Sequence, residues 1–403
     1  MKPRKYLFQI ISLLVFASLL AACGGGAATT EAPVATEAPA TEAPATEAPA
    51  TEAPATEAPA DPMADLSAAC KEEGMVTIIA TPASWANYGE IFELFKAKSG
   101  AEINSLDENA GSADELAAID ANKDNKGPQA PDIIDVGYAY GDQAKDAGQI
   151  QPYKVSTWDA IPDTAIGLPA KDPDGYWTGG YYGVMAIEVN TAVVTNVPQN
   201  WADLLKPEYA GQVALAGDPR SSNQAAQSVI GAALANGGSF DDVQPGLDFF
   251  KQLNEAGNFV PVIAKPGTIA QGATPIVIAW DYIGFGDQAT LAGNPPIEVV
   301  YPSPSIAGMY VQGISAYAPH PNCAKLWMEI LHSDEGQLAW LKGHAIPIQI
   351  DDLTARGIIT ADLQAMVPTV EASSPTPDQL SSARDIIKTG WDTTVGVDIP
   401  ESP

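Results

Sequence analysis

The chain has few residues of three kinds that often carry protein chemistry. Its 403 residues include three cysteines, three histidines and only 20 lysines and arginines. Three cysteines are too few for a disulfide scaffold, and three histidines limit histidine-based metal sites and catalysis. The 20 basic residues stand against 50 acidic ones, which gives a formal charge of −30. Since such a chain cannot neutralise a run of phosphates, its composition excludes a nucleic-acid-binding protein.

Catalytic and metal-binding motifs are missing as well. The sequence has neither a Gly-x-Ser-x-Gly elbow nor a Gly-x-x-x-x-Gly-Lys-Ser/Thr phosphate loop. His320, His332 and His344 recur every twelve residues, but no cysteine or carboxylate cluster completes a zinc pattern. We therefore expect a protein that is not an enzyme and uses no metal or cofactor. A surface-tethered enzyme acting on polar small molecules stays open as the alternative.

The first residues carry the pattern of a secretory signal. Three basic residues precede an apolar run, Tyr6–Leu20, which is followed by Ala21-Ala22-Cys23. This stretch resembles a bacterial lipobox. The resemblance implies that residues 1–22 are a signal peptide and that Cys23 becomes the lipidated N-terminus. The alternative is an ordinary secretory signal in which Cys23 has no special role.

Residues 23–61 are expected to form a lipidated N-terminus and a disordered stalk. Five tandem copies of Thr-Glu-Ala-Pro-Ala cover residues 36–60. A proline in every copy blocks a continuous helix, and the glutamates repel one another, so the segment should be extended. We expect an extracytoplasmic protein that meets the cell membrane only through its lipid anchor.

The folded body carries most of the acidity. From Pro62 to Pro403 there are 43 acidic and 17 basic residues, a balance of −26. Two interpretations are open: the charge keeps an extracellular protein soluble, or it favours a cationic ligand.

Helix and strand patterns alternate along this body. Tyr88–Ser99 places Ile91, Phe92 and Phe95 on one helical face and is followed by Gly100, a good C-terminal cap. Short apolar runs such as Pro275–Trp280 favour buried strands. The alternation predicts an α/β fold with mixed sheets flanked by helices, and 342 residues favour two lobes over one.

The order of several segments resembles the solute-binding proteins of bacterial ABC importers, the group that includes ferric-iron, polyamine, thiamine and phosphonate binders. The segments are Cys70–Ile78, Pro131–Val136, Val189–Thr191 with Pro198–Gly211, and Ala316–Gly343. Val189-Asn190-Thr191 followed by Pro198-Gln199-Asn200-Trp201 is the most specific of these matches. The similarity covers about Ala64 to Val397.

The resemblance implies a type II periplasmic-binding-protein-like fold: two lobes, a hinge, and a cleft that holds the ligand. The implied organisation is lobe 1 over 62–180, lobe 2 over 181–290, a return to lobe 1 over 291–345, and C-terminal helices over 346–403 that belong mainly to lobe 2. The implied partners are a small-molecule solute and an ABC permease with its ATPase subunits, and we expect a monomer.

The resemblance also places the first helix and a late helix in the same lobe. This supports a disulfide between Cys70 and Cys323, which an oxidising compartment would permit. Two separate buried thiols are the alternative.

Candidate ligand contacts should follow strands that point at the cleft. Ser84, Trp85, Asn87 and Tyr88 come after the first strand and lead into a helix, whose N–H groups could hold an anionic group. Alternatively, Ser84 or Asn87 only caps the helix and Trp85 covers the edge of the core.

Two tyrosine pairs are further candidates. Tyr138 and Tyr140 follow another strand and point the same way if the chain is extended; packing under a loop is the alternative. Tyr181 and Tyr182 lie in the aromatic and glycine-rich run 174–183, which we expect to form a hairpin near the lobe crossover. Adjacent residues of a strand face opposite sides, so this pair is a poor chelate.

Trp280, Asp281 and Tyr282 stand at the carboxyl edge of an apolar strand. Asp281 could pair with an ammonium group while the rings supply cation–π contacts; alternatively, Asp281 caps the next helix. The ferric binders that the chain resembles carry their tyrosine pair at this place, and the single tyrosine here argues against iron. Tyr310 is a weaker candidate. We expect an organic cation such as a polyamine or a thiamine-like molecule, with ferric iron or a phosphonate or other organophosphate as the alternative.

Overall fold

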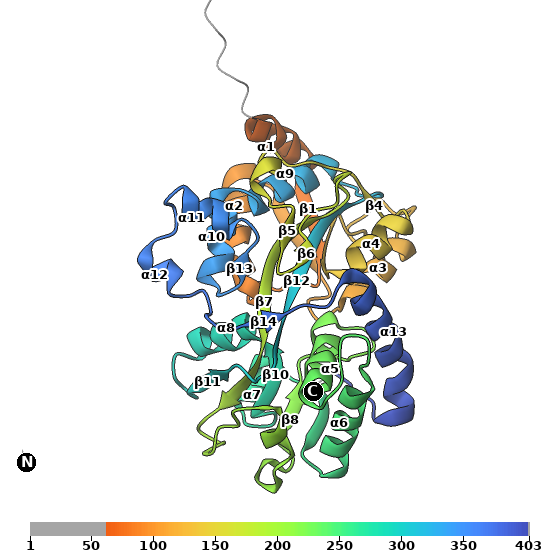
Figure 1. Cartoon of the computed structure of the whole chain (residues 1–403). Coiled ribbons are helices and arrows are strands. Elements are labelled where there is room, and N and C mark those ends of the chain that lie inside the picture. The colour runs from red at the N-terminus through yellow and green to blue at the C-terminus, as the bar shows by residue number, and fades with distance from the viewer. Residues whose placement is uncertain (1–61, 402–403) are drawn as a thin grey trace, which may run out of the picture. The chain divides into compact units, whose positions relative to one another are not determined.

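The computed structural model describes residues 62–401, shown in Figure 1. The predicted signal peptide, Cys23 and the repeat stalk lie outside the described residues. Within residues 62–401, none of the helices has the length and apolar character needed to cross a bilayer.

One part of the body, which we call lobe 1, is built around strands β1, β3 and the second half of β12. Its elements are α1 (Pro62–Glu73), β1 (Met75–Ile79), α2 (Tyr88–Ser99), β2 (Glu102–Leu106), α3 (Ser112–Ala121), β3 (Ile133–Gly137), α4 (Ala139–Asp146), β4 (Ile150–Gln151), β5 (Thr164–Ala165), β6 (Leu168–Pro169), α9 (Pro321–Leu331), α10 (Asp334–Lys342) and β13 (Ile346–Pro347). β1 pairs with β2 in parallel, and β3 pairs antiparallel with β12.

The other part, lobe 2, contains the parallel strands β9, β8 and β10 in that order. Its elements are β8 (Val213–Leu215), α5 (Asn223–Ala235), α6 (Gln244–Glu255), β9 (Phe259–Ile263), α7 (Pro266–Ala270), β10 (Ile276–Trp280), α8 (Asp281–Leu291), β11 (Ile297–Val300) and α13 (Pro377–Thr394). In Figure 1 the helices α5, α6 and α13 lie together on one side of these strands.

Two long strands run through both lobes. β7 (Thr178–Asn190) pairs with β12 (Ser305–Ser315) through its first half and with β10 and β11 through its second half. The chain returns to lobe 2 through α11 (Ile350–Ala355), α12 (Ala361–Gln364) and the short strand β14 (Ala372–Ser373), which pairs with the start of β12. The expected mixed sheet flanked by helices is confirmed. The lobe boundaries drawn from the sequence stay a prediction.

The run 174–183 matches the expected hairpin only in part. A turn is closed where Lys171 bridges antiparallel to Thr178 and the Asp172 N–H donates to the Trp177 oxygen at 3.0 Å, and from Thr178 onwards the run is the start of the 13-residue strand β7. Extended strands normally avoid glycine, yet Gly183 is required here. A Cβ at this position would lie 2.6 Å from the Tyr282 ring and 2.9 Å from Oδ1 of Asp281. The glycine therefore marks a close approach of two elements, not a turn.

A disulfide and a set of hydrogen bonds join α1 to α9. Cys70 on α1 and Cys323 on α9 form a disulfide with an S–S distance of 1.99 Å. Beside it, the Glu73 carboxylate accepts hydrogen bonds from the backbone N–H groups of Asn322 and Cys323, at 3.0 Å and 2.8 Å. These N–H groups belong to the first turn of α9, where the helix has no partner of its own for them.

Candidate functional site

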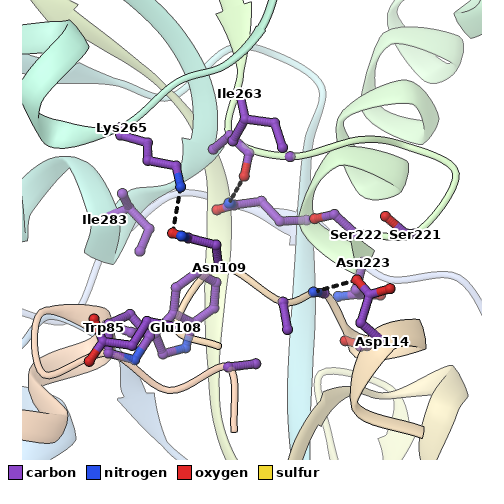
Figure 2. Close-up of a pocket in the computed structure, with 18 of the residues that line it drawn as sticks. Trp85, Glu108, Asn109, Asp114, Ser221, Ser222, Asn223, Ile263, Lys265 and Ile283 are labelled. Carbon is purple, nitrogen blue, oxygen red and sulfur yellow. Dashed lines mark hydrogen bonds between the residues drawn. The ribbon is translucent and has the colours of Figure 1, made fainter. Parts of the chain in front are cut away.

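A cavity of about 250 Å³ lies between the two lobes (Figure 2). Its walls come from loops and helix starts of both lobes: Ala80–Trp85 and Glu108–Glu115 with Asp135 and Tyr310 on one side, and Ala216–Gln224, Ile263–Pro266, Ile283, Asp287 and Glu401 on the other. Most of these segments follow the carboxyl ends of β1, β2, β8, β9 and β10. Side chains and free helix N–H groups converge at this edge of an α/β sheet, which makes it a favoured place for a ligand.

Acidic side chains dominate the lining. Seven carboxyl groups line the cavity against one lysine, Lys265; the acids are Glu108, Asp114, Glu115, Asp135, Asp218, Asp287 and Glu401. Two of them already have cationic partners, because Glu401 lies 2.5 Å from Lys265 and Asp218 lies 2.6 Å from Arg220. The remaining acids leave the cavity with an excess of negative charge, which attracts cations.

Asp135 is the centre of a buried hydrogen-bond network behind the cavity. Its carboxylate accepts hydrogen bonds from the hydroxyls of Tyr88 and Tyr181 and from Nε2 of Gln312, the last at 2.9 Å. Its backbone N–H donates to the Glu115 carboxylate at 2.9 Å. Burial raises the pKa of Asp135 to about 6, against the opposing effect of these donors, and raises that of Glu115 well above its usual value.

Trp85 connects this network to the cavity. Its indole N–H donates to the Tyr181 hydroxyl at 2.6 Å. Its ring lies edge-on to Tyr282 and Tyr310, with ring centroids 5.4 Å apart in both pairs. The two residues that follow Trp85 have φ angles of 45° and 62°, in the left-handed region that costs energy for a side chain other than glycine. The surrounding contacts therefore hold the Trp85 loop in a strained conformation at the cavity wall.

The N-terminus of α5 also faces the cavity. Ser222 caps this helix, since its hydroxyl accepts from the Ala225 N–H. Asn223 in the first turn is 1% exposed and lines the cavity. Its amide lies near the Tyr310 phenol, but neither amide atom makes a hydrogen bond of standard geometry. A helix N-terminus with an unsatisfied amide beside it is suited to a carboxylate or phosphate group.

Two buried acids lie next to each other at the lobe 2 wall. Glu188 on β7 and Asp287 on α8 are 2% and 5% exposed, and both oxygens of Glu188 lack a donor within residues 62–401. Burial, followed by repulsion from Asp287, raises the pKa of Glu188 well above its usual value. Burial raises the pKa of Asp287 to about 6. The pair is close enough to share a proton, which removes one of the two charges.

Two contacts join the lobes around the cavity. Nζ of Lys265, after β9, donates to Oδ1 of Asn109, after β2, as Figure 2 shows. The hydroxyl of Tyr140 on α4 donates to the backbone oxygen of Ser221 at 3.1 Å. The guanidinium of Arg384 on α13 lies 3.4 Å above the Tyr140 ring. Both lobes therefore contribute to each contact, and separating them would break both.

Three of the residues singled out from the sequence line the cavity: Ser84, Trp85 and Tyr310. The other nine do not, and their positions explain why. Asn87 starts α2 and bonds Glu90 and the Ala339 oxygen. Tyr88 and Tyr181 bond Asp135 inside lobe 1. Tyr182 is on the opposite face of β7 from Tyr181, and Trp280 and Tyr282 are packed in the core. The part of these residues in solute binding stays a prediction.

Tyr138 and Tyr140 are not in an extended segment. Tyr138 caps α4 and Tyr140 lies in its first turn, so they do not point to one side as a strand pair would. Tyr138 packs edge-on against Trp177. Asp281, expected to meet an ammonium group, is 1% exposed and bonded to protein groups on both oxygens.

Several cavity residues were missed in the sequence. Asp135 lies within the strand Ile133–Gly137, which looks like plain core. Asn109 and Lys265 lie in polar loops after strands, and Asn223 begins the helix that follows β8; a polar residue at such a place is the signal that could have indicated them. Within residues 62–401, no group of three or more His, Cys, Asp or Glu residues is arranged to hold a metal ion.

Comparisons with known proteins identify a family and a relative by sequence. Residues 129–363 match the model of a family described as bacterial extracellular solute-binding protein. An uncharacterised protein of Haemophilus influenzae is 30% identical over 248 residues, which cover 59% of this chain and 68% of the relative.

Solved structures show the same fold. The periplasmic binding protein AfuA of Actinobacillus pleuropneumoniae, with fructose-6-phosphate bound, matches 80% of this chain and 99% of its own, with a TM-score of 0.62 and 20% identity. Iron-bound HitA of Pseudomonas aeruginosa also matches 80% of this chain and 99% of its own, with a TM-score of 0.58 and 15% identity. MotA of A. tumefaciens in complex with glucopine covers 79% of this chain and 99% of its own, with a TM-score of 0.60 and 16% identity.

These neighbours are two-lobed binding proteins, so the expected fold class is confirmed. At such low identity they show the fold and not the ligand. The family consists of extracellular binding proteins, which places the folded body outside the cytoplasm. Because the family model covers more than half of the sequence, the chain belongs to the bacterial extracellular solute-binding proteins.

Proposed function

We propose that this protein is the substrate-binding component of a bacterial ABC importer. It captures a small solute in the cavity between its lobes and delivers the solute to a membrane permease driven by separate ATPase subunits. Family membership supports this role, as does a cavity built from strand ends of two lobes. Closure over a solute changes the surface that a permease meets, which lets the permease distinguish the loaded protein from the empty one.

The solute carries a positive charge in this proposal, as in a polyamine or a thiamine-like molecule. The observation that carries it is the surplus of carboxyl groups over the single Lys265 in the cavity wall. Glu108 and Asp114 are more exposed than Asp135 and can meet an ammonium group, although Oδ2 of Asp114 also accepts the Gly111 N–H at 2.9 Å. The half-buried ring of Trp85 adds a surface for cation–π contact. Asp281 has no part in this contact, since its oxygens are occupied.

A solute with an anionic group, such as a phosphonate or another organophosphate, is the second candidate. The N-terminus of α5 and the unsatisfied Asn223 amide favour it. A zwitterion could place its cationic group near the cavity carboxyls and its anionic group at the N-terminus of α5. Ferric iron has less support, because Tyr181 is bonded to Asp135 and Tyr182 lies on the other face of β7.

A screen for solutes that stabilise the protein tests the proposal. The melting temperature is measured with each of six compounds in turn: spermidine, putrescine, thiamine, fructose 6-phosphate, 2-aminoethylphosphonate and ferric citrate. Each compound that raises the melting temperature is then titrated calorimetrically to obtain its Kd. A solute at 100 times its Kd adds about 2.7 kcal/mol to the free energy of unfolding. Stabilisation by the amines supports a cationic solute. Stabilisation by ferric citrate or the phosphate ester alone would reject the cationic solute.

We also propose that Cys23 is lipidated and that the repeat segment holds a monomeric body away from the membrane. The basic, apolar and small-residue order before Cys23 supports this. In cells, Cys23→Ser should release the protein from the membrane fraction, while the wild type stays there until detergent is added. Equal membrane retention of both forms would contradict a lipid anchor at Cys23.

A further inference from the structure

Besides the return through β14, two chain segments cross between the lobes at one place. Within β7, residues 178–184 pair with β12, and residues 185–190 pair with β10 and β11. The crossing on this strand therefore falls at Val184. The second crossing is the connection Tyr301–Pro304, which leads from β11 in lobe 2 into β12. Any opening of the lobes has to change the backbone angles of such segments.

One carboxylate holds both crossings. Asp281 is the first residue of α8 and is 1% exposed. Its Oδ1 accepts the backbone N–H of Val184 at 3.0 Å and that of Tyr282 at 2.9 Å. Its Oδ2 accepts the hydroxyl of Tyr301 at 3.0 Å. Asp281 thus ties β7, the connection after β11 and the start of α8 to one another.

The same helix forms part of the cavity wall. Ile283 and Asp287 of α8 both line the cavity, two and six residues after Asp281. The close packing of β7 against Asp281 leaves no space for a Cβ at Gly183. Movement of the crossing at Val184 therefore cannot leave α8 in place.

We infer that Asp281 is a positioning residue for solute capture, which holds both crossing segments and the cavity-lining helix α8 in one arrangement. This role rests on the proposed function. This positioning role explains why the Asp281 side chain, which directly follows β10, is directed into the protein and not into the cavity. An ionised carboxylate suits this place, because all three neighbouring groups are donors.

The stability of this arrangement depends on the protonation of Asp281. Burial raises its pKa to about 7, and its three donors oppose that rise. The titratable groups around it are Tyr301 on the connection, Tyr182 on β7 and Tyr282 on α8. Burial raises the pKa of all three tyrosines, so they stay neutral near pH 7. A neutral Asp281 can donate its proton to the Tyr301 oxygen, whereas an ionised Asp281 is enclosed at a cost in solvation. Opening that exposes this carboxyl to water therefore becomes easier as pH rises through 7.

Hydrogen exchange of the full-length protein tests this inference without a solute. Amide protection at Val184 and Tyr282, corrected for the intrinsic pH effect, is measured at pH 6 and pH 8. In the wild type, protection should rise roughly tenfold from pH 8 to pH 6, because the raised pKa of Asp281 means that the closed form binds about one proton more than the open form. Asp281→Asn cannot titrate and should show the same protection at both pH values. Tyr301→Phe should keep a pH effect at reduced protection, and exposed Asp159→Asn should behave as the wild type.

Spermidine titration adds a second measurement. If spermidine binds, its Kd should change less between pH 6 and pH 8 in Asp281→Asn than in the wild type, because the variant has lost one titrating group. If no form binds spermidine, the cationic solute is rejected while the exchange measurement still decides the role of Asp281. The same pH profile of protection in the wild type and Asp281→Asn would overturn the inference.

Discussion

Nζ of Lys265 in lobe 2 lies 2.5 Å from Oδ1 of Asn109 in lobe 1, across the cavity. Lys265 keeps a second partner, Glu401, in its own lobe. The contact with Asn109 exists only when the lobes are together, so it stabilises the arrangement that encloses a solute. Since a bound solute needs that arrangement, breaking the contact should lower affinity and leave the lobes themselves intact.

Asn109→Ala tests this relationship. We expect the Kd of the captured solute to weaken by about 2–5-fold, which corresponds to a partly exposed hydrogen bond worth about 0.5–1 kcal/mol. The melting temperature of the empty protein should change little. Calorimetric titration measures the Kd, with Asn196→Ala on the exposed lobe 2 surface as the control. An unchanged Kd would show that the contact has no role in capture.

Trp85→Phe removes the indole N–H that bonds Tyr181 but keeps an aromatic ring at the cavity wall. We expect a loss of about 1 kcal/mol in solute binding. Trp85→Ala also removes the edge-on contacts with Tyr282 and Tyr310 and should cost more, about 2–3 kcal/mol. Titration and tryptophan fluorescence measure both variants, and Trp158→Phe, outside the cavity wall, is the control. If alanine is tolerated as well as phenylalanine, the ring does not contact the solute.

Glu188→Gln tests the buried acid pair through pH. In the unfolded chain both Glu188 and Asp287 ionise near pH 4, whereas in the folded protein their pKa values are raised. The folded protein then binds more protons above pH 4, so this contribution to stability falls as pH rises through 6 and beyond.

Between pH 5 and pH 8, the free energy of unfolding should fall by about 1–2 kcal/mol more in the wild type than in Glu188→Gln. Urea denaturation at the two pH values provides the comparison. Glu298→Gln, on the exposed face of the neighbouring strand β11, should keep the wild-type slope. Parallel slopes for all three proteins would mean that Glu188 does not titrate differently on folding.

The paired variant Cys70→Ser/Cys323→Ser removes the disulfide between α1 and α9. Loss of this crosslink should lower the free energy of unfolding by about 2–5 kcal/mol. Guanidinium denaturation measures the change, and the wild type treated with reductant should approach the variant. If neither treatment shifts the midpoint, the bond does not constrain the unfolded chain.

Local patterns in the sequence were sufficient for much of the fold. The helix Tyr88–Ser99 has the predicted bounds, and the predicted strand Pro275–Trp280 agrees with β10 to within one residue, because the apolar pattern and a flanking glycine or proline define them locally. The length of β7 was not predicted. Its glycines and aromatics suggested a hairpin, which closes only at the bridge between Lys171 and Thr178, and the partner strands β12 and β10 make the rest of the segment extended.

The cavity was harder to predict, because its chemistry depends on long-range contacts. Asp281 looked like a ligand contact from its place after a strand, but its partners Val184 and Tyr301 come from distant segments. Glu188 sits in a run typical of a buried strand, and its proximity to Asp287 appears only in the folded chain. Trp85 was found because its loop directly follows β1.

The disulfide and the Glu73 hydrogen bonds that join α1 to α9 determine which part of the folded body receives a force applied to the N-terminus. Everything that precedes residue 62 is connected through α1, so a pull on the N-terminal segment acts first on that helix. The disulfide transmits the force to Cys323 through a covalent bond. The Glu73 carboxylate keeps the first turn of α9 bound to α1. The force then runs into lobe 1 without crossing the cavity, Val184 or Tyr301. With the lipid anchor that we propose at Cys23, tension on the N-terminal segment would therefore leave the contacts of the cavity unloaded.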